Sequence, residues 1–246
     1  MKSKPEDLTQ TLRRLSLTFV AQNYDAMAQD AAREQLTHVD YLRRLAEGEA
    51  AERYERSVKR RIKRARLPVV KTLEQFNWSW PTKINRVQVQ ELFRLRFVEQ
   101  NANVVLIGGV GLGKTHLAAA LAHTACLHDV STLFASAVDI VNTLSAAQAV
   151  HALSKALKTY VSPRLLIIDE LGYLPMDKRG ADLLFQVISA RYERGAIIIT
   201  TNTAYKHWPR VFNNDATITS AILDRLLHHC ETVTIEGKSY RMKDKS

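Results

Sequence analysis

Cysteine is scarce in this sequence, and long apolar runs are missing from it. Cys126 and Cys230 lie far apart and in no paired motif, so we expect reduced thiols and no disulfide framework. No apolar run approaches the roughly 18 residues of a membrane span. The polar start of the chain has no apolar stretch like that of a secretory signal. These absences favour a cytoplasmic protein that does not partner with a membrane.

Glycine and proline are nearly absent from residues 1–67, where Gly48 and Pro5 are the only examples. Leucine and other apolar residues recur there at helical spacing. We therefore expect a small all-α N-terminal domain of two or three helices. Pro68 marks the predicted boundary with a second domain, residues 68–246.

Acidic residues are too few to balance the basic ones, since 35 Lys and Arg stand against 25 Asp and Glu and leave a net charge of +10. Residues 53–66 hold eight basic residues and one acidic residue. Like charges at helical spacing repel one another, so this run favours binding to a polyanion, of which nucleic acid is the first candidate. A solvated helix face is the alternative. The residues expected to contact nucleic acid are Arg56, Lys59, Arg60, Arg61, Lys63 and Arg64.

Aromatic residues are also few, yet Phe76, Trp78 and Trp80 alternate in the connector that follows Pro68. We interpret them as a packed hydrophobic strap, with a base-stacking surface as the alternative.

From residue 104 onward, short apolar runs alternate with helical stretches. This pattern is typical of an α/β fold whose parallel sheet is covered on both faces. The five predicted strands are residues 104–107, 131–135, 165–168, 196–200 and 231–235.

Residues 108–115 read GGVGLGKT and match the phosphate-binding pattern G-x-x-x-x-G-K-[ST]. They follow an apolar run and open an alanine-rich helical stretch, which is the context that the pattern requires. Glycines let the backbone N–H groups approach phosphate oxygens at the start of a helix. We expect Lys114 to reach the β- and γ-phosphates and the hydroxyl of Thr115 to bind Mg²⁺. The residues expected to hold the nucleotide are Gly108, Gly109, Val110, Gly111, Leu112, Gly113, Lys114, Thr115 and His116.

Further polar groups follow two other predicted strands. Asp169 and Glu170 come directly after residues 165–168, and ligands bind at the carboxyl ends of strands in such sheets. We expect Asp169 to hold Mg²⁺ and Glu170 to polarise the attacking water. Asn202, after residues 196–200, is expected to orient that water, and a local turn is the alternative role for it.

With these elements the chain resembles the AAA+ ATPases. More specifically, it resembles the IstB-type helper ATPases of insertion-sequence transposition, which are related to the DnaC helicase loaders and to DnaA. The resemblance extends from about residue 8 to residue 241. Besides the phosphate loop, residues 166–175, 181–194, 200–202, 221–228 and 237–241 carry it. Residues 166–175 separate this family from other AAA+ proteins.

The resemblance implies an ATPase that uses ATP and Mg²⁺, forms a homo-oligomer on double-stranded DNA and assists a transposase. It places Arg225 at the arginine finger, which would act on a neighbouring subunit, and Arg241 at a second arginine sensor. It also marks residues 139–162 as a DNA-binding insertion, in which Lys155 and Lys158 are the candidate contacts.

Only about ten residues follow Ile235, so we expect no C-terminal lid domain of the kind that AAA+ proteins usually carry. The alternative function is a DnaC-like loader of a replicative helicase, which would use residues 1–67 to bind the helicase.

His228 and His229 adjoin Cys230, but no second group of ligands lies at a useful spacing in the sequence. Because zinc sites need four ligands, the sequence predicts no metal site at these histidines.

Overall fold

The computed structural model of the protein describes residues 7–240. The chain forms two compact units, Met1–Arg60 and Arg61–Ser246. The division falls inside the long helix α3 (His38–Ala65), before the boundary that Pro68 led us to expect.

The N-terminal unit consists of α1 (Leu8–Arg14), α2 (Thr18–Arg33) and the first part of α3. Ser16 takes a positive φ of 59° between α1 and α2, which divides the expected helical stretch into two helices. Apolar residues recur at helical spacing on these helices, but Leu8 and Leu42 are exposed while Leu45 is buried. This unit therefore buries only part of its apolar stripe on itself.

A buried carboxylate, Glu49, ties α3 to the first turn of α2. Its Oε2 accepts hydrogen bonds from the N–H groups of Phe19 (2.8 Å) and Val20 (3.3 Å), and its Oε1 accepts from Arg53 and Arg56. Burial alone would raise the pKa of Glu49, but the hydrogen bonds from Arg53 and from these N–H groups outweigh it and lower the pKa.

In the described residues the second unit is built on a parallel sheet of five strands in the order β2-β3-β4-β1-β5, as expected. The strands are β1 (Asn103–Gly108), β2 (Thr132–Ser136), β3 (Leu165–Leu171), β4 (Ala196–Thr201) and β5 (Cys230–Ile235).

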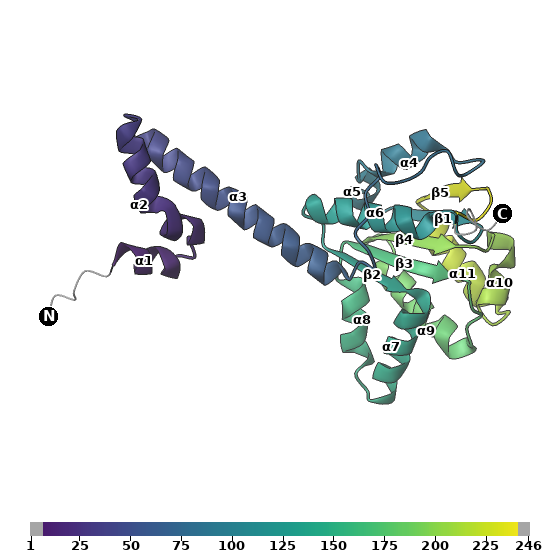
Figure 1. The fold of residues 1–246 in the computed structure, drawn as a ribbon. Helices are drawn as coiled ribbons and strands as arrows, with labels where there is room; N and C mark the ends of the chain where they lie inside the picture. The colour runs from purple at the N-terminus through teal and green to yellow at the C-terminus, as the bar shows by residue number, and fades with distance from the viewer. Residues whose placement is uncertain (1–6, 241–246) are drawn as a thin grey trace. The chain divides into compact units, whose positions relative to one another are not determined.

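Helices cover both faces of this sheet (Figure 1). One face carries α4 (Arg86–Leu92), α5 (Arg96–Glu99) and α6 (Lys114–Leu127). The other carries α7 (Ala137–Ala149), α8 (Leu153–Val161), α9 (Lys178–Arg191), α10 (Trp208–Val211) and α11 (Ala216–Leu227). A short 3₁₀ helix, Tyr205–His207, precedes α10.

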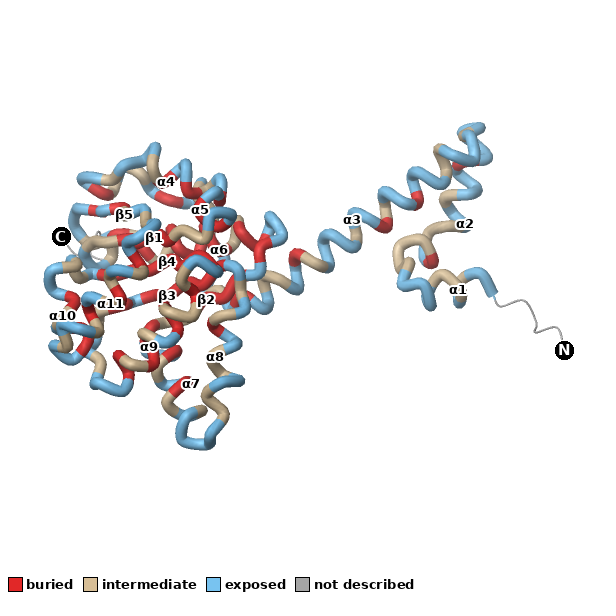
Figure 2. The backbone as a smooth tube through the Cα atoms, turned by 180° about the vertical axis from the view of Figure 1, so that it is seen from behind, coloured by how far each residue is buried: buried red, intermediate tan, exposed pale blue. Residues whose placement is uncertain are grey.

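Alternate residues of each strand face opposite layers, which explains why the strands are apolar throughout. Val104 and Leu106 pack under α6, whereas Val105 packs with the other layer. Figure 2 shows the buried residues gathered in the strands and on the helix surfaces that face them.

Within residues 7–240 the last element is β5, and no helix follows it. The helices of the same range include none with the length and apolar character needed to cross a membrane. The expected insertion is helical, since α7 and α8 span most of residues 139–162.

Candidate nucleotide-binding site

The phosphate loop joins β1 to α6 and depends on glycine at two positions. Gly111 and Gly113 take φ values of 75° and 85°, in the region that favours glycine. A Cβ on Gly113 would also lie 2.6 Å from the ring of Phe76. Gly113 is the N-cap of α6, so the loop brings the free N–H groups of the first helical turn to one place.

Lys114 begins α6 and is almost fully buried, with 4% of its surface exposed. Its Nζ donates hydrogen bonds of 2.7 Å to the carbonyls of Gly108 and Gly109. The ring of Tyr173 lies 6.0 Å from the same nitrogen, within reach of a cation–π contact. The loop therefore contains a buried positive charge, which suits an anionic ligand.

Thr115 faces the first of the two predicted carboxylates. Its Oγ1 lies 3.1 and 3.2 Å from the carboxylate oxygens of Asp169, which is 6% exposed. The hydroxyl of Thr200 in β4 also donates to Asp169 and accepts the N–H of Glu170, at 3.0 Å. Thr200 thus positions both acidic residues. The sequence places Thr200 at the end of a predicted strand but does not predict this role.

Glu170 is turned away from Asp169 by a bulge in β3. The pairing of β3 with β4 shifts register between Ile168 and Leu171, and Glu170 has a φ of 60°. A bulge redirects a side chain within a strand. Asp169 is consequently buried beside the loop while Glu170 is exposed and faces the cavity in front of it.

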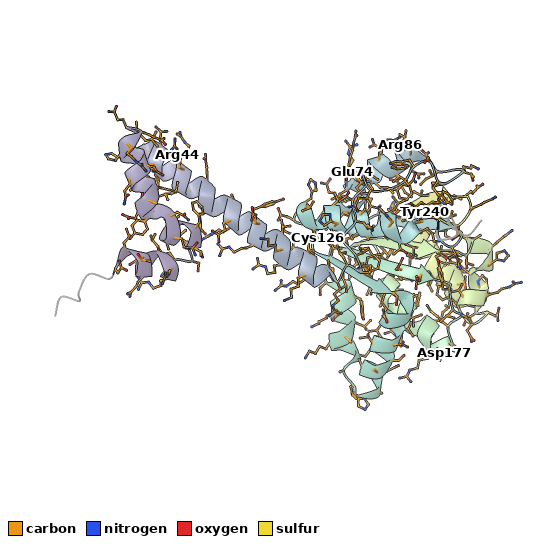
Figure 3. The ribbon with its side chains drawn as sticks, viewed as in Figure 1. Arg44, Glu74, Arg86, Cys126, Asp177 and Tyr240 are labelled. Carbon is orange, nitrogen blue, oxygen red and sulfur yellow. The ribbon has the colours of Figure 1, made fainter. Side chains whose placement is uncertain are left out.

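The cavity has a volume of about 430 Å³, in the range of small-molecule sites. The loop residues from Gly111 to His116 form one wall, Glu170 and Tyr173 another, and residues 69–81 with Tyr240 a third. The N–H of Tyr240 donates to the carbonyl of Gly111, at 2.9 Å, and so joins the end of the described chain to the loop. Figure 3 labels Tyr240 and Cys126 at opposite ends of α6.

The family of IstB-like ATP-binding proteins matches residues 10–246 of the sequence, nearly the whole chain. The chain belongs to this family.

Relatives of similar length share more than a third of its residues. The ATP-binding protein of insertion sequence IS21 from Pseudomonas aeruginosa is 39% identical over 97% of this chain and 90% of its own length. The corresponding protein of IS5376 from Geobacillus stearothermophilus is 37% identical over 98% of this chain and 95% of its own length.

Solved structures share the AAA+ fold at lower identity. The DnaC helicase loader has a TM-score of 0.54 and 21% identity, over 67% of this chain and 96% of its own. AMPPCP-bound DnaA from Aquifex aeolicus has a TM-score of 0.57 and 22% identity over 73% of this chain. The match spans 56% of that DnaA chain.

The predicted aromatic strap is packed in part. Phe76 is buried in the core, and its ring meets that of Trp78 edge to face at 4.9 Å. Trp80 instead lines the cavity, where its ring meets Tyr240 at 5.2 Å. Sequence reasoning missed this wall because Trp80 and Tyr240 come together only in the folded chain.

His116 also lines the cavity, and its ring meets that of Phe76 edge to face. Burial lowers its pKa, which disfavours a positive charge on this ring beside the phosphate loop.

Two other candidates lie outside the wall of the cavity. Asn202 directly follows β4, which lies between β1 and β3, and its Oδ1 accepts from the hydroxyl of Thr203. Arg225 on α11 donates to the carbonyl of Ala221 and stacks over Phe185, at 5.1 Å. Arg241 lies outside the described residues.

The side chains that are candidates for DNA contact differ in the ion pairs and hydrogen bonds that they form within the chain. Arg56 pairs with Glu49 and Glu52, and Lys59 is 3.9 Å from Glu55. In the second unit, Arg61 donates to the carbonyl of Cys126 and pairs with Asp129, both at 2.7 Å, and only 16% of its side chain is exposed. Arg61 is thus engaged at the end of α6. The basic side chains among these candidates that are exposed are Arg56, Lys59, Arg60, Lys63, Arg64, Lys155 and Lys158.

The structure also joins groups that are distant in sequence. Glu193 lies beside His228 and His229, with one potential ligand atom of each residue within 4.8 Å of the others. Sequence spacing gave no sign of this third ligand.

Proposed function

We propose that this protein is an ATPase that assembles as a homo-oligomer on double-stranded DNA and assists the transposase of an insertion sequence. The observation that carries this proposal is the cavity itself. Residues 111–115 of the phosphate loop and Glu170 line it, and the carboxylate of Asp169 lies 3.1 Å from the hydroxyl of Thr115. The relatives of this chain are ATP-binding proteins of insertion sequences.

ATP would place its phosphates against the loop, where the N–H groups at the start of α6 and the ammonium of Lys114 offset their charge. Residues 69–81 and Tyr240 form the wall available to the base. The donor set suits Mg²⁺, because the hydroxyl of Thr115 and the carboxylate of Asp169 are oxygen ligands already held side by side. Mg²⁺ bound there would offset the charge of the phosphates.

Hydrolysis needs a group that activates water in front of the phosphates. Glu170 is suited to this task, because the bulge points it into the cavity beside the phosphate loop. Asn202, at the neighbouring strand end, would orient the water. Arg225 lies outside the cavity of its own chain, so it would complete the site of an adjacent subunit and stabilise the charge that develops on the γ-phosphate.

DNA binding would use the exposed basic side chains of α3 and, separately, those of α8. Lys155 and Lys158 are one helical turn apart and exposed, whereas Leu157 and Tyr160 of the same helix pack on the core. Such contacts are made to phosphates and carry little base specificity.

The test is a salt titration of binding to duplex DNA by the full chain with a non-hydrolysable ATP analogue. With some 6–10 phosphate contacts, affinity should fall about 10³-fold or more between 50 and 200 mM salt. The double substitution Lys63→Ala and Arg64→Ala should weaken DNA binding and make the affinity less dependent on salt concentration. The control, Lys178→Ala with Lys206→Ala, removes the same charge from other exposed sites. It should change neither the affinity for DNA nor the dependence of that affinity on salt. An affinity for DNA that does not change with salt concentration would refute the proposal.

A helicase loader remains the second candidate function, because the N-terminal unit offers an apolar groove. This groove has a volume of about 410 Å³ and includes Leu12, Val20 and Leu42 in its lining. A protein partner suits such a surface better than DNA does. Retention of a replicative helicase by the full chain, lost on Leu42→Ser, would favour the loader, and retention of duplex DNA alone would favour the transposition helper.

A further inference from the structure

A cluster of two histidines and a carboxylate lies at the amino ends of the strands, at the opposite edge of the sheet from the phosphate loop. Glu193 follows α9, and His228 and His229 join α11 to β5. We infer that Glu193, His228 and His229 form a binding site for a divalent transition-metal ion of the zinc class.

Two asparagines at and just before the start of β1 hold the backbone of these ligands. Asn101 donates from its side chain to the carbonyl of Glu193, at 3.2 Å. The N–H of Asn103 donates to the carbonyl of His229, at 2.7 Å. Glu193 itself has a positive φ of 57° in the turn between α9 and β4. The two turns that carry the ligands are therefore anchored to the same short segment.

The side chains are also close to a coordinating arrangement. The hydroxyl of Tyr192 lies 2.8 Å from Nδ1 of His228 and holds that ring beside Glu193, whose carboxylate is 3.9 Å away. The two imidazole rings are 4.1 Å apart between centroids. Zinc bond lengths of about 2.0–2.1 Å separate tetrahedral ligands by about 3.3 Å. Small rotations of these exposed side chains from their present separation of at most 4.8 Å are enough to reach that spacing.

The ligand chemistry selects the kind of ion. Imidazole nitrogen suits zinc, copper, nickel and iron, while magnesium prefers oxygen ligands alone. Two histidines and one carboxylate leave a fourth position for water, which the exposure of the site allows.

The electrostatics of the helix end favour a cation there. His228 is the C-cap of α11, and the carbonyl groups of a C-terminal turn carry partial negative charge. One turn earlier on the same helix, the charges of Asp224 and Arg225 offset each other, so the attraction comes from these carbonyl groups and from Glu193.

The test is calorimetric titration of the metal-free full chain with Zn²⁺ in the presence of millimolar Mg²⁺, which occupies oxygen-only sites such as that of Asp169. One Zn²⁺ per chain should bind saturably, and Co²⁺ in its place should show the visible absorption of a four-coordinate ion. His229→Ala should abolish this binding, and Glu193→Gln should weaken it at least about tenfold. His151→Ala, which removes an exposed histidine elsewhere, is the matched control and should change nothing.

Thermal unfolding of the metal-free variants distinguishes a lost site from a damaged fold. All three substitutions are at exposed positions, so their unfolding midpoints should match that of the unaltered chain, and Zn²⁺ should raise the midpoint only where the site is intact. Absence of saturable binding would overturn the inference. So would binding that survives both His229→Ala and Glu193→Gln, or binding that His151→Ala removes.

Discussion

The two edges of the sheet use polar side chains in different ways. At the carboxyl ends of the strands, Lys114, Glu170 and Tyr173 line a cavity. At the amino ends, polar side chains bind main-chain carbonyl groups. Arg191 is almost fully buried and donates to the carbonyls of Tyr160, Val161, Pro163, Arg164 and Ala196.

Asn103 and Arg61 act at the amino-terminal edge in the same way. Asn103 donates to the carbonyl of Leu226 and accepts from the N–H of Ile197, and Arg61 donates to the carbonyl at the end of α6. Arg191, Asn103 and Arg61 thus complete the backbone at the amino-terminal edge, while side chains at the carboxyl-terminal edge line a cavity for a ligand. Substitution of those three residues should therefore change stability, whereas substitution in the cavity wall should change ligand binding or catalysis.

The largest effect is expected for Lys114→Ala, which should abolish measurable ATP binding. It removes the charge that the loop buries, and each charge-assisted hydrogen bond to phosphate contributes about 1.5–3 kcal/mol. Titration with a fluorescent ATP analogue measures it, with the exposed Lys178→Ala as control. Retained affinity would show that the loop does not bind the phosphates.

Arg225→Ala should lower ATP hydrolysis about 10³-fold while leaving ATP binding intact. Arg225 lies near the amino ends of the strands, in the last turn of α11. An effect of this residue on catalysis would therefore be an exception to the difference between the two edges of the sheet. Mixing this variant with Lys114→Ala subunits should restore activity, because each mixed interface can pair an intact loop with an intact arginine. Failure of the mixture, in assemblies shown to contain both chains, would argue against action between subunits.

Glu170→Gln should slow hydrolysis by about 100-fold or more and leave ATP affinity unchanged, because the amide cannot activate water. Single-turnover hydrolysis and equilibrium binding measure the two quantities. A parallel loss of affinity would mean that Glu170 holds the nucleotide and does not act in the chemical step.

Arg191→Met should destabilise the fold by about 3 kcal/mol or more, because buried carbonyls lose their donor. Burial lowers the pKa of Arg191 to about 10, so the guanidinium is still charged at neutral pH. The unfolding midpoint should drop by roughly 6–12 °C, whereas the exposed Arg194→Met should hardly move it. ATP affinity at a temperature where the variant is folded should be unchanged. A loss of ATP affinity without a loss of stability would contradict the structural role of Arg191 at this edge of the sheet.

Arg61→Ala should have the smallest effect, about 1 kcal/mol, because its partner Asp129 is largely exposed and the ion pair is screened. Chemical denaturation measures it, with the exposed Arg60→Ala as control. If Arg61→Ala instead weakens DNA binding and leaves stability unchanged, then Arg61 leaves the end of α6 to contact DNA.

Much of the carboxyl-terminal edge could be predicted because its groups are carried by short contiguous motifs. The loop from Gly108 to Thr115 needs particular residues for its own backbone conformation, and Asp169 follows an apolar run that can only be a buried strand. The exposed face of α1 and α3 could not be predicted, because helical spacing shows which residues share a face and not what covers that face.

The sequence by itself determined the fold class, the strands and the place of the phosphate loop, since each depends on residues that are neighbours in the chain. The tertiary structure alone decided that Thr200 positions Asp169 and Glu170, that Trp80 and Tyr240 share a cavity wall, and that Glu193 joins His228 and His229. These groups meet through strand order and register, which bring together turns about thirty or more residues apart. Their proximity is a property of the packed sheet, and no local pattern records it.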